Sequence, residues 1–255
     1  MKTFISLIIV SLISISGLIG QTITETYTEP GTYTFTVPSN IVSLTVECWG
    51  GGGAGGGSTT GGAAAGGGGG GAYSRSVVPV SPGMDYEFIV GAGGIGSTGN
   101  GPNGTASSFN SNQVMAVGGL GGTANQNGLG GFGGFAIDCI GDFRYSGGNG
   151  AAGNGSNTGG GGGGAGTNHN GEDANGMTGG SGGADFGGNG ADGVSISGYD
   201  GENGFDFGGG GSGGLKSTGW FASNMWGGNG ADGAVKITYT IPECTGIPNP
   251  GTATI

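Results

Sequence analysis

The distribution of glycine constrains this chain more than any other feature of its sequence. The 255 residues include 74 glycines, about four times the share found in an ordinary globular protein. All but five of these glycines lie between Gly50 and Gly233. Glycine has no side chain to bury and loses more backbone entropy on folding than any other residue. The sequence therefore predicts a β-like shell of ordinary composition around a glycine-rich interior.

Alternating segments outside the densest glycine runs predict β-strands. Residues 32–37 and 41–49 alternate polar and apolar side chains, which is typical of half-buried strands. The turn residues at 38–40 predict that these two strands are neighbours. By the same reasoning we expect four further strands, at residues 73–80, 86–90, 113–117 and 234–241. No segment repeats its apolar residues with a helical period, so the sequence predicts an all-β fold.

Residues 118–233 are the part of the chain with the most unusual composition. They hold 46 glycines and no proline, which is typical of a flexible linker. They also carry many large apolar side chains, among them Phe132, Phe135 and Ile137, which a solvated tether does not need. Extended glycine strands with three residues per turn can instead satisfy one another's backbone groups when they pack side by side. We therefore expect a packed polyglycine bundle, with a disordered linker as the alternative.

A seven-residue motif, GGNGA[AD]G, recurs at residues 147–153, 187–193 and 227–233, with starts 40 residues apart. It predicts a recurring turn or strand-end element. The second copy also fits a calcium-binding nonapeptide in which Asp192 would supply an oxygen ligand, and Asp232 holds the same place in the third copy. Calcium-binding rolls repeat every nine residues, however. The wider spacing favours Asp192 and Asp232 as turn residues, and we expect no metal and no cofactor.

Charge and the N-terminal segment limit the class of protein. Five Lys and Arg against 16 Asp and Glu give a net charge of −11, without the basic surface that nucleic acids require. Residues 1–20 place one lysine before a short apolar run, which predicts a secretory signal peptide. No later segment is apolar over the length of a membrane helix. We therefore expect an extracellular or cell-surface location, with no membrane span in the mature chain.

Four stretches occur in an order that resembles a known family: TYTFTVPSNIVSLTVECWGGGGAGGG, GAYSRSVVPVSPGMDYEFIVGAGG, TASSFNSNQVMAVGGLGG and GGNGADGAVKITYT. Over about residues 22–241 they resemble the glycine-rich domain of bacterial surface proteins and phage tail-fibre proteins. The extracellular glycine-rich domain of anaplastic lymphoma kinase receptors is a more distant likeness. The resemblance implies a jelly-roll β-sandwich over residues 21–241, with insertions at 118–233 that form polyglycine II helices. It also implies a role in recognition or surface architecture and carries no catalytic site.

A second resemblance begins where that domain ends. Residues 244–255, CTGIPNPGTATI, resemble the opening of Ig-like modules in Bacteroidetes-type surface proteins. We therefore interpret residues 242–255 as a linker and the start of such a module, in a fragment of a larger protein. Cys244 would then pair further along, which leaves Cys48 and Cys139 as the expected disulfide of an exported domain. A bond between Cys48 and Cys244 is the alternative.

The polar residues of the glycine-rich region do not predict catalysis. Six carboxylates lie there and could be read as the acid and base of a glycosidase: Glu172, Asp173, Asp185, Asp200, Glu202 and Asp206. Such chemistry needs two carboxylates held by a rigid element, and none is predicted here, so we interpret them as surface charge. The single histidine, His169, has no nucleophile near it in the sequence. We expect that the protein is not an enzyme.

Aromatic residues late in the chain are the best candidates for binding. Trp220, Phe221 and Trp226 occur within seven residues, and Tyr199, Phe205 and Phe207 precede them. Aromatic rings on exposed loops stack well on sugars, although these rings could instead cap the ends of a glycine bundle. We expect a secreted or cell-surface adhesion module that contacts glycans or cell-surface proteins. A structural spacer without a ligand is the alternative, and ice binding is a third hypothesis.

Overall fold

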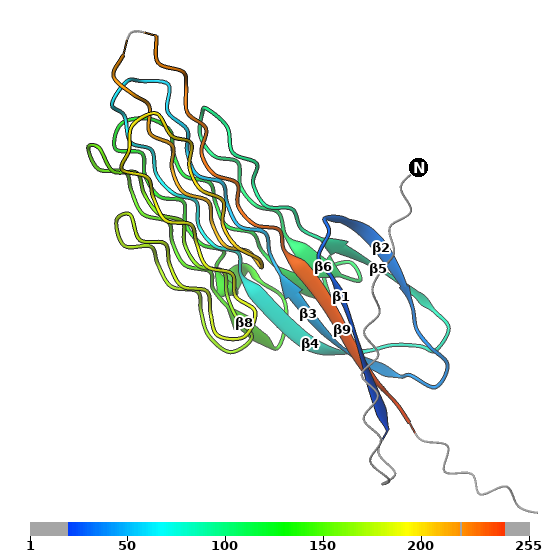
Figure 1. Ribbon diagram of the computed structural model, residues 1–255. Helices are drawn as coiled ribbons and strands as arrows, with labels where there is room; N and C mark the ends of the chain where they lie inside the picture. Colours follow the sequence, from blue (N-terminus) through cyan, green and yellow to red (C-terminus); the bar gives the residue numbers. More distant parts are fainter. Residues whose placement is uncertain (1–19, 220, 243–255) are drawn as a thin grey trace, which may run out of the picture.

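The computed structural model describes residues 20–219 and 221–242. These residues form two antiparallel β-sheets at one end of an elongated molecule and long glycine-rich segments at the other (Figure 1). The described elements are strands, apart from one short 3-10 helix, η1 (Ala136–Asp138). The predicted all-β class is confirmed. Residues 1–19 of the predicted signal peptide, Trp220, and residues 243–255 with Cys244 and the Ig-like resemblance lie outside the described residues.

The two sheets contain nine strands. The first sheet has the order β1-β9-β3-β4-β8, with β1 (Gln21–Tyr27), β9 (Ala234–Ile241), β3 (Ser43–Trp49), β4 (Tyr73–Pro79) and β8 (Phe143–Tyr145). The second has the order β2-β5-β6-β7, with β2 (Gly31–Thr36), β5 (Asp85–Val90), β6 (Ser107–Phe109) and β7 (Val114–Ala116). All neighbouring strands run antiparallel.

The prediction that the strands at 32–37 and 41–49 are neighbours is wrong. β2 pairs with β5 in one sheet, whereas β3 lies between β9 and β4 in the other. The turn that ends at Asn40, whose φ is 70°, carries the chain from one sheet to the other. Both strands can then bury their apolar faces against each other. The sequence also gave no prediction of β1, β6 and β8.

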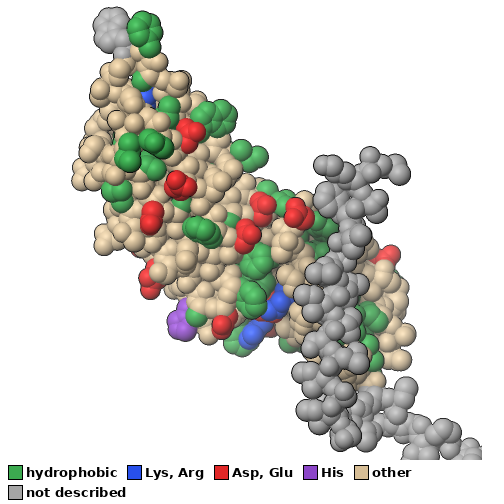
Figure 2. All heavy atoms as spheres, in the orientation of Figure 1, with side chains coloured by type: hydrophobic (Ala, Val, Ile, Leu, Met, Phe, Trp, Pro, Cys, Tyr) green, Lys and Arg blue, Asp and Glu red, His purple; other side chains and the backbone are tan. Residues whose placement is uncertain are grey.

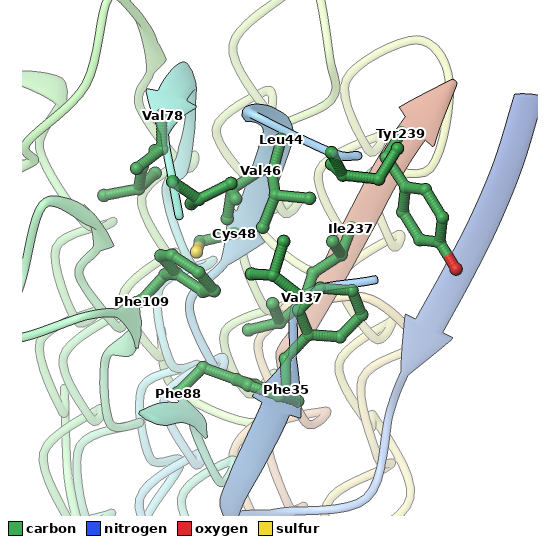
Figure 3. Close-up of a cluster of buried hydrophobic side chains, with 14 of the residues drawn as sticks. Phe35, Val37, Leu44, Val46, Cys48, Val78, Phe88, Phe109, Ile237 and Tyr239 are labelled. Atoms are coloured by element: carbon green, nitrogen blue, oxygen red, sulfur yellow. The ribbon is translucent and has the colours of Figure 1, made fainter. Parts of the chain in front are cut away.

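The core lies between the two sheets, and Figure 3 shows side chains of both sheets pointing toward one another. Leu44, Val46 and Cys48 of β3 are completely buried, as the alternation predicts. Val42 belongs to the predicted strand at residues 41–49 but precedes β3 and is exposed. Aromatic rings fill the space between the sheets, with Phe88 and Phe109 stacked at 6.5 Å between centroids. Such burial of large apolar side chains supplies the main stabilisation of this half.

The glycine-rich segments form what we call the glycine bundle, comprising residues 50–72, 91–106, 117–135, 146–219 and 221–233. Along residues 50–58, successive backbone N–H groups donate in rotation to three neighbouring segments at N···O distances of 2.8–3.0 Å. These neighbours are the segments 66–72, 99–105 and 225–231. Every third N–H group therefore returns to the same neighbour. The glycine bundle is cross-linked by its own backbone and is not a solvated linker, and it includes segments before residue 118.

Close approach between backbones explains why the interior consists of glycine. A Cβ atom built on Gly68 would overlap the carbonyl oxygen of Gly53, and one on Gly52 would overlap that of Gly209. Most glycines of the bundle show the same overlap with a neighbouring carbonyl group. A methyl group there would force the segments apart and break their hydrogen bonds.

A second buried cluster joins the two halves. Trp49 and Tyr73 lie at the ends of their strands, with ring centroids 5.0 Å apart, and pack beside Ala165 of the glycine bundle. The hydroxyl of Tyr73 donates to Glu47 Oε1 at 2.7 Å, and Lys236 forms an ion pair with Glu47 Oε2 at 2.7 Å. Phe207 packs on Trp49 at 5.8 Å and thus belongs to this junction.

The two ends of the described chain lie together, far from the glycine bundle. Gln21 of β1 pairs with Ile241 of β9 at the end of the sheets that points away from the bundle (Figure 1). The orange segments around residues 215–219 and 221–226 form the opposite end of the molecule, which we call the tip (Figure 1). The bundle therefore projects away from the point where the chain enters and leaves the domain.

Candidate functional site

Three of the predicted binding residues lie exposed near the tip, and we call them the tip surface: Tyr199, Phe221 and Trp226. Phe221 is fully exposed, and Tyr199 and Trp226 are 59 % and 53 % exposed. The residues that follow Tyr199 are hydrogen-bonded to Trp226: Trp226 N donates to Asp200 Oδ1 at 2.7 Å, and Gly201 N donates to Trp226 O at 2.8 Å. Trp220, the fourth predicted binding residue, lies outside the described residues.

A different residue closes the end of the glycine bundle. Leu215 is 1 % exposed and forms bridges with both Ala64 and Tyr199. In the part of the chain that the structure describes, the rings of Tyr199, Phe221 and Trp226 form no aromatic pair. Phe221 and more than half of the surface of Tyr199 and of Trp226 are exposed to solvent, whereas Leu215 is buried at this end of the glycine bundle.

The three copies of GGNGA[AD]G share one structural role at the edges of the glycine bundle. The asparagine of each copy accepts a hydrogen bond from a glycine N–H of the neighbouring segment, at 2.7–3.0 Å. These pairs are Asn149 with Gly133, Asn189 with Gly182, and Asn229 with Gly96. Three residues later, the Oδ1 atoms of Asp192 and Asp232 accept from Gly179 and Gly93, both at 2.8 Å. The motif therefore caps backbone groups along an edge.

In Asp192 and in Asp232, one carboxylate oxygen thus has a structural role as a hydrogen-bond acceptor. Neither belongs to a cluster of three metal-ligating side chains, and within residues 20–219 and 221–242 no such cluster of His, Cys, Asp and Glu occurs. A hard cation such as calcium takes six to eight oxygen ligands. Hydrogen bonding to backbone N–H groups accounts for both aspartates without a metal.

The six carboxylates considered for catalysis are dispersed. Asp173 Oδ1 accepts from Asn149 N and Asp200 Oδ1 from Trp226 N, both at 2.7 Å, so these two cap edges as well. Figure 2 shows the acidic side chains scattered over this face of the glycine bundle. His169 contacts its neighbour, with Nδ1 at 2.7 Å from Asn168 Oδ1. The structure does not bring these groups together as an acid and base pair.

The expected disulfide between Cys48 and Cys139 is wrong, because both residues are buried free thiols. Cys48 points into the core between the sheets, where burial raises the pKa of its thiol (Figure 3). Cys139 follows η1, and its Sγ donates to the carbonyl oxygen of Phe135 at 3.5 Å. Each thiol thus has its own place in the packing, and neither is bonded to the other.

A groove on the side of the glycine bundle escaped the sequence analysis. It has a volume of about 350 Å³ and lies over residues 189–192, between the segments 179–181 and 202–205. Apart from Ala191 and the ring of Phe205, its side chains are polar: Ser181, Asn189, Asp192, Glu202 and Asn203. Glu202 and Phe205 were singled out for other reasons, but Ser181, Asn189 and Asn203 were not. The only signal in the sequence is that Asn189 and Asp192 are three residues apart, as are Glu202 and Phe205.

Comparison with known proteins identifies the family of the chain. No curated protein matches the chain. In the described residues, no helix is both long enough and apolar enough to cross a bilayer. The model of the glycine-rich domain family matches residues 27–240, which covers β2 to β8, the glycine bundle and all but the last residue of β9. The chain therefore belongs to the glycine-rich domain family.

Proposed function

We propose that this protein is a non-catalytic recognition module, exported and displayed at the cell surface as part of a larger protein. It contacts glycans or other surface molecules through the tip surface. The observation that carries the proposal is the placement of Tyr199, Phe221 and Trp226, which are exposed at the end opposite Gln21 and Ile241. Exposed aromatic groups held by a rigid scaffold are typical of recognition surfaces.

The finer architecture is part of the same proposal. The two facing sheets are a jelly-roll-like sandwich, and the glycine bundle is a set of polyglycine II helices. The rotation of hydrogen bonds along residues 50–58 supports this, since a helix with three residues per turn directs every third N–H group to the same neighbour. Such a bundle would hold the tip surface at a fixed distance from the point of attachment.

A retention assay tests the proposed function. Beads coated with the full chain are allowed to settle on a panel of bacterial and animal cells and are then washed under flow. The variant Phe221→Ala/Trp226→Ala should lose retention about tenfold or more, because two desolvated aromatic contacts together contribute at least about 1.4 kcal/mol. The matched control is Val42→Ala/Val77→Ala, which removes two exposed apolar side chains from the sheets at the other end.

The outcomes separate recognition from the second candidate, a structural spacer. Retention that survives loss of the tip rings, or falls equally in the control, contradicts recognition by the tip surface. The spacer is favoured by one observation, the regular cross-linking of the glycine bundle by its backbone, which gives a stiff rod without any ligand. A folded protein that no cell retains would support the spacer, and thermal hysteresis in the same sample would support ice binding.

A further inference from the structure

The groove beside residues 189–192 combines one aromatic face with hydrogen-bonding groups. Phe205 is 62 % exposed and forms one wall together with Glu202, three residues earlier in the same segment. Ser181 lies on the opposite wall. Asn189 and Asp192 stand between the walls. The volume of about 350 Å³ is at the lower end of the range for small-ligand sites, enough for one sugar ring.

The polar groups of the groove are oriented before any ligand arrives. Asn189 Oδ1 is fixed by Gly182 N, Asp192 Oδ1 by Gly179 N and Asn203 Oδ1 by Asn229 N, each at 2.8 Å. The second polar atom of each side chain, Nδ2 or Oδ2, forms no hydrogen bond with any described residue. The orientation of each side chain is therefore fixed, and its second polar atom can form a hydrogen bond with a ligand. Groups fixed in this way lose little conformational entropy on binding.

The remaining polar groups in the groove are also free. The side chains of Ser181 and Glu202 form no hydrogen bond within the described part of the chain, although Glu202 N donates to Ser212 Oγ. The groove is thus lined by amide, carboxylate and hydroxyl groups together with one aromatic ring. This is the pattern that a polyhydroxyl ligand satisfies, since each hydroxyl both donates and accepts.

The backbone groups that line the groove are only partly paired. Gly190 N donates to Gly180 O, and Phe205 N donates to Asn189 O. The N–H groups of Ser181, Asn189, Asp192 and Asn203 form no hydrogen bond with a described residue. A ligand can therefore be recognised by backbone donors as well as by side chains.

The charge of the groove narrows the ligand class further. Two of its side chains are the carboxylates of Asp192 and Glu202, and no lysine, arginine or histidine lines it. An anionic ligand would be repelled, whereas a neutral one can pair its hydroxyl groups with these carboxylates.

We propose that this groove binds a neutral sugar unit of a glycan, with the apolar face of the sugar on Phe205 and its hydroxyl groups on Asn189, Asp192, Glu202 and Asn203. The inference rests on the proposed function, because it assigns a substrate class to the recognition module. It places a carbohydrate site on the side of the glycine bundle, apart from the tip surface.

The test measures binding of the full chain to neutral tetrasaccharides of glucose, mannose, galactose and N-acetylglucosamine, with uronate oligosaccharides as anionic probes. We expect saturable binding of at least one neutral probe and none of the uronates. Phe205→Ala should raise the Kd at least tenfold, and Glu202→Gln should admit uronates by removing a repulsive charge. The control Phe132→Ala removes an equally exposed phenylalanine from another segment of the bundle and should leave the Kd unchanged.

The result separates this inference from the proposed function. If binding of neutral sugars persists in Phe205→Ala but disappears in Phe221→Ala/Trp226→Ala, the groove is not the sugar site. Recognition by the tip surface is then still supported. If Phe205→Ala abolishes sugar binding while Phe221→Ala/Trp226→Ala leaves retention on cells unchanged, the sugar site in the groove is supported. Recognition by the tip surface is then contradicted. Binding of uronates alone, or of no probe by a folded protein that cells still retain, overturns the carbohydrate inference and favours a protein ligand.

Discussion

The carboxylate of Asp232 accepts a hydrogen bond from the backbone N–H of Gly93, with 2.8 Å between Oδ1 and N. The two residues lie 139 positions apart, on adjacent segments of the glycine bundle. An edge segment of such a bundle leaves backbone donors without a backbone acceptor, and an unpaired donor destabilises the fold. Short side chains with an oxygen, placed every third residue, solve this problem.

The first copy of the motif should gain stability if its missing acceptor is supplied. Ala152 takes the place that Asp192 and Asp232 hold in the other copies, and Gly130 N, the donor it would face, forms no hydrogen bond with a described residue. We predict that Ala152→Asp and Ala152→Asn each raise the free energy of unfolding by about 1 kcal/mol, the usual value of one hydrogen bond. Urea denaturation measures the change. Ala152→Val should give no gain, and equal stability of all three variants would refute the capping role.

Packing of backbone against backbone predicts a large difference between two glycine positions. A Cβ atom on Gly68 would overlap the carbonyl oxygen of Gly53, whereas one on Gly99 has only Ser97 Oγ nearby, at 3.9 Å. We predict that Gly68→Ala lowers the free energy of unfolding by about 3 kcal/mol and that Gly99→Ala changes it by less than about 1 kcal/mol. Thermal denaturation of both variants checks this. Equal, small effects would mean that the segments are not in contact.

Stability should fall as the pH rises above about 10, the pKa at which tyrosines of an unfolded chain ionise. Burial raises the pKa of Tyr27 and Tyr73 above that value, and hydrogen bonds to Glu25 and Glu47 add to the effect. In this range the unfolded chain loses protons that the folded chain retains, so the free energy of unfolding decreases with pH. Below pH 9 these two groups contribute no pH dependence.

Urea midpoints between pH 8 and pH 11 measure this slope. Tyr73→Phe should flatten the decline, because it removes one of the protons that only the folded state holds. Tyr199→Phe, at an exposed ring, should follow the wild type. A wild-type midpoint that stays constant up to pH 11 would contradict the buried hydroxyl groups at these positions.

Strands with alternating side chains could be predicted from the sequence, because a buried face repeats every second residue. β3, β4, β5 and β9 lie within a residue or two of the predicted segments. The pairing of β2 with β5 could not be predicted, since the turn at Asn40 has the same composition whether it joins neighbours or crosses between sheets. β6 and β8, with three residues each, are too short for alternation to show.

Which segments of the glycine bundle are neighbours could not be predicted from the sequence, for a related reason. Without side chains, nothing in residues 66–72 specifies which segments will surround them, and register is set by the side chains at the edges. Asn229 and Asp232 specify the neighbouring segment, because side chains three residues apart accept hydrogen bonds from Gly96 N and Gly93 N. A sequence analysis that looks for turns does not use this spacing. The free thiols of Cys48 and Cys139 were missed because cysteine counting ignores where each side chain points.

Hydrogen exchange of backbone amides tests most directly whether the glycine bundle is an ordered scaffold, on which both the tip surface and the groove depend. In the native full chain, residues 50–58 and 66–72 should exchange as slowly as β3 and β9, because their N–H groups are bonded to neighbouring segments. Peptide-resolved mass spectrometry gives the protection of each segment. Exchange of the glycine segments at the rate of an unfolded chain, beside protected strands, would contradict the account.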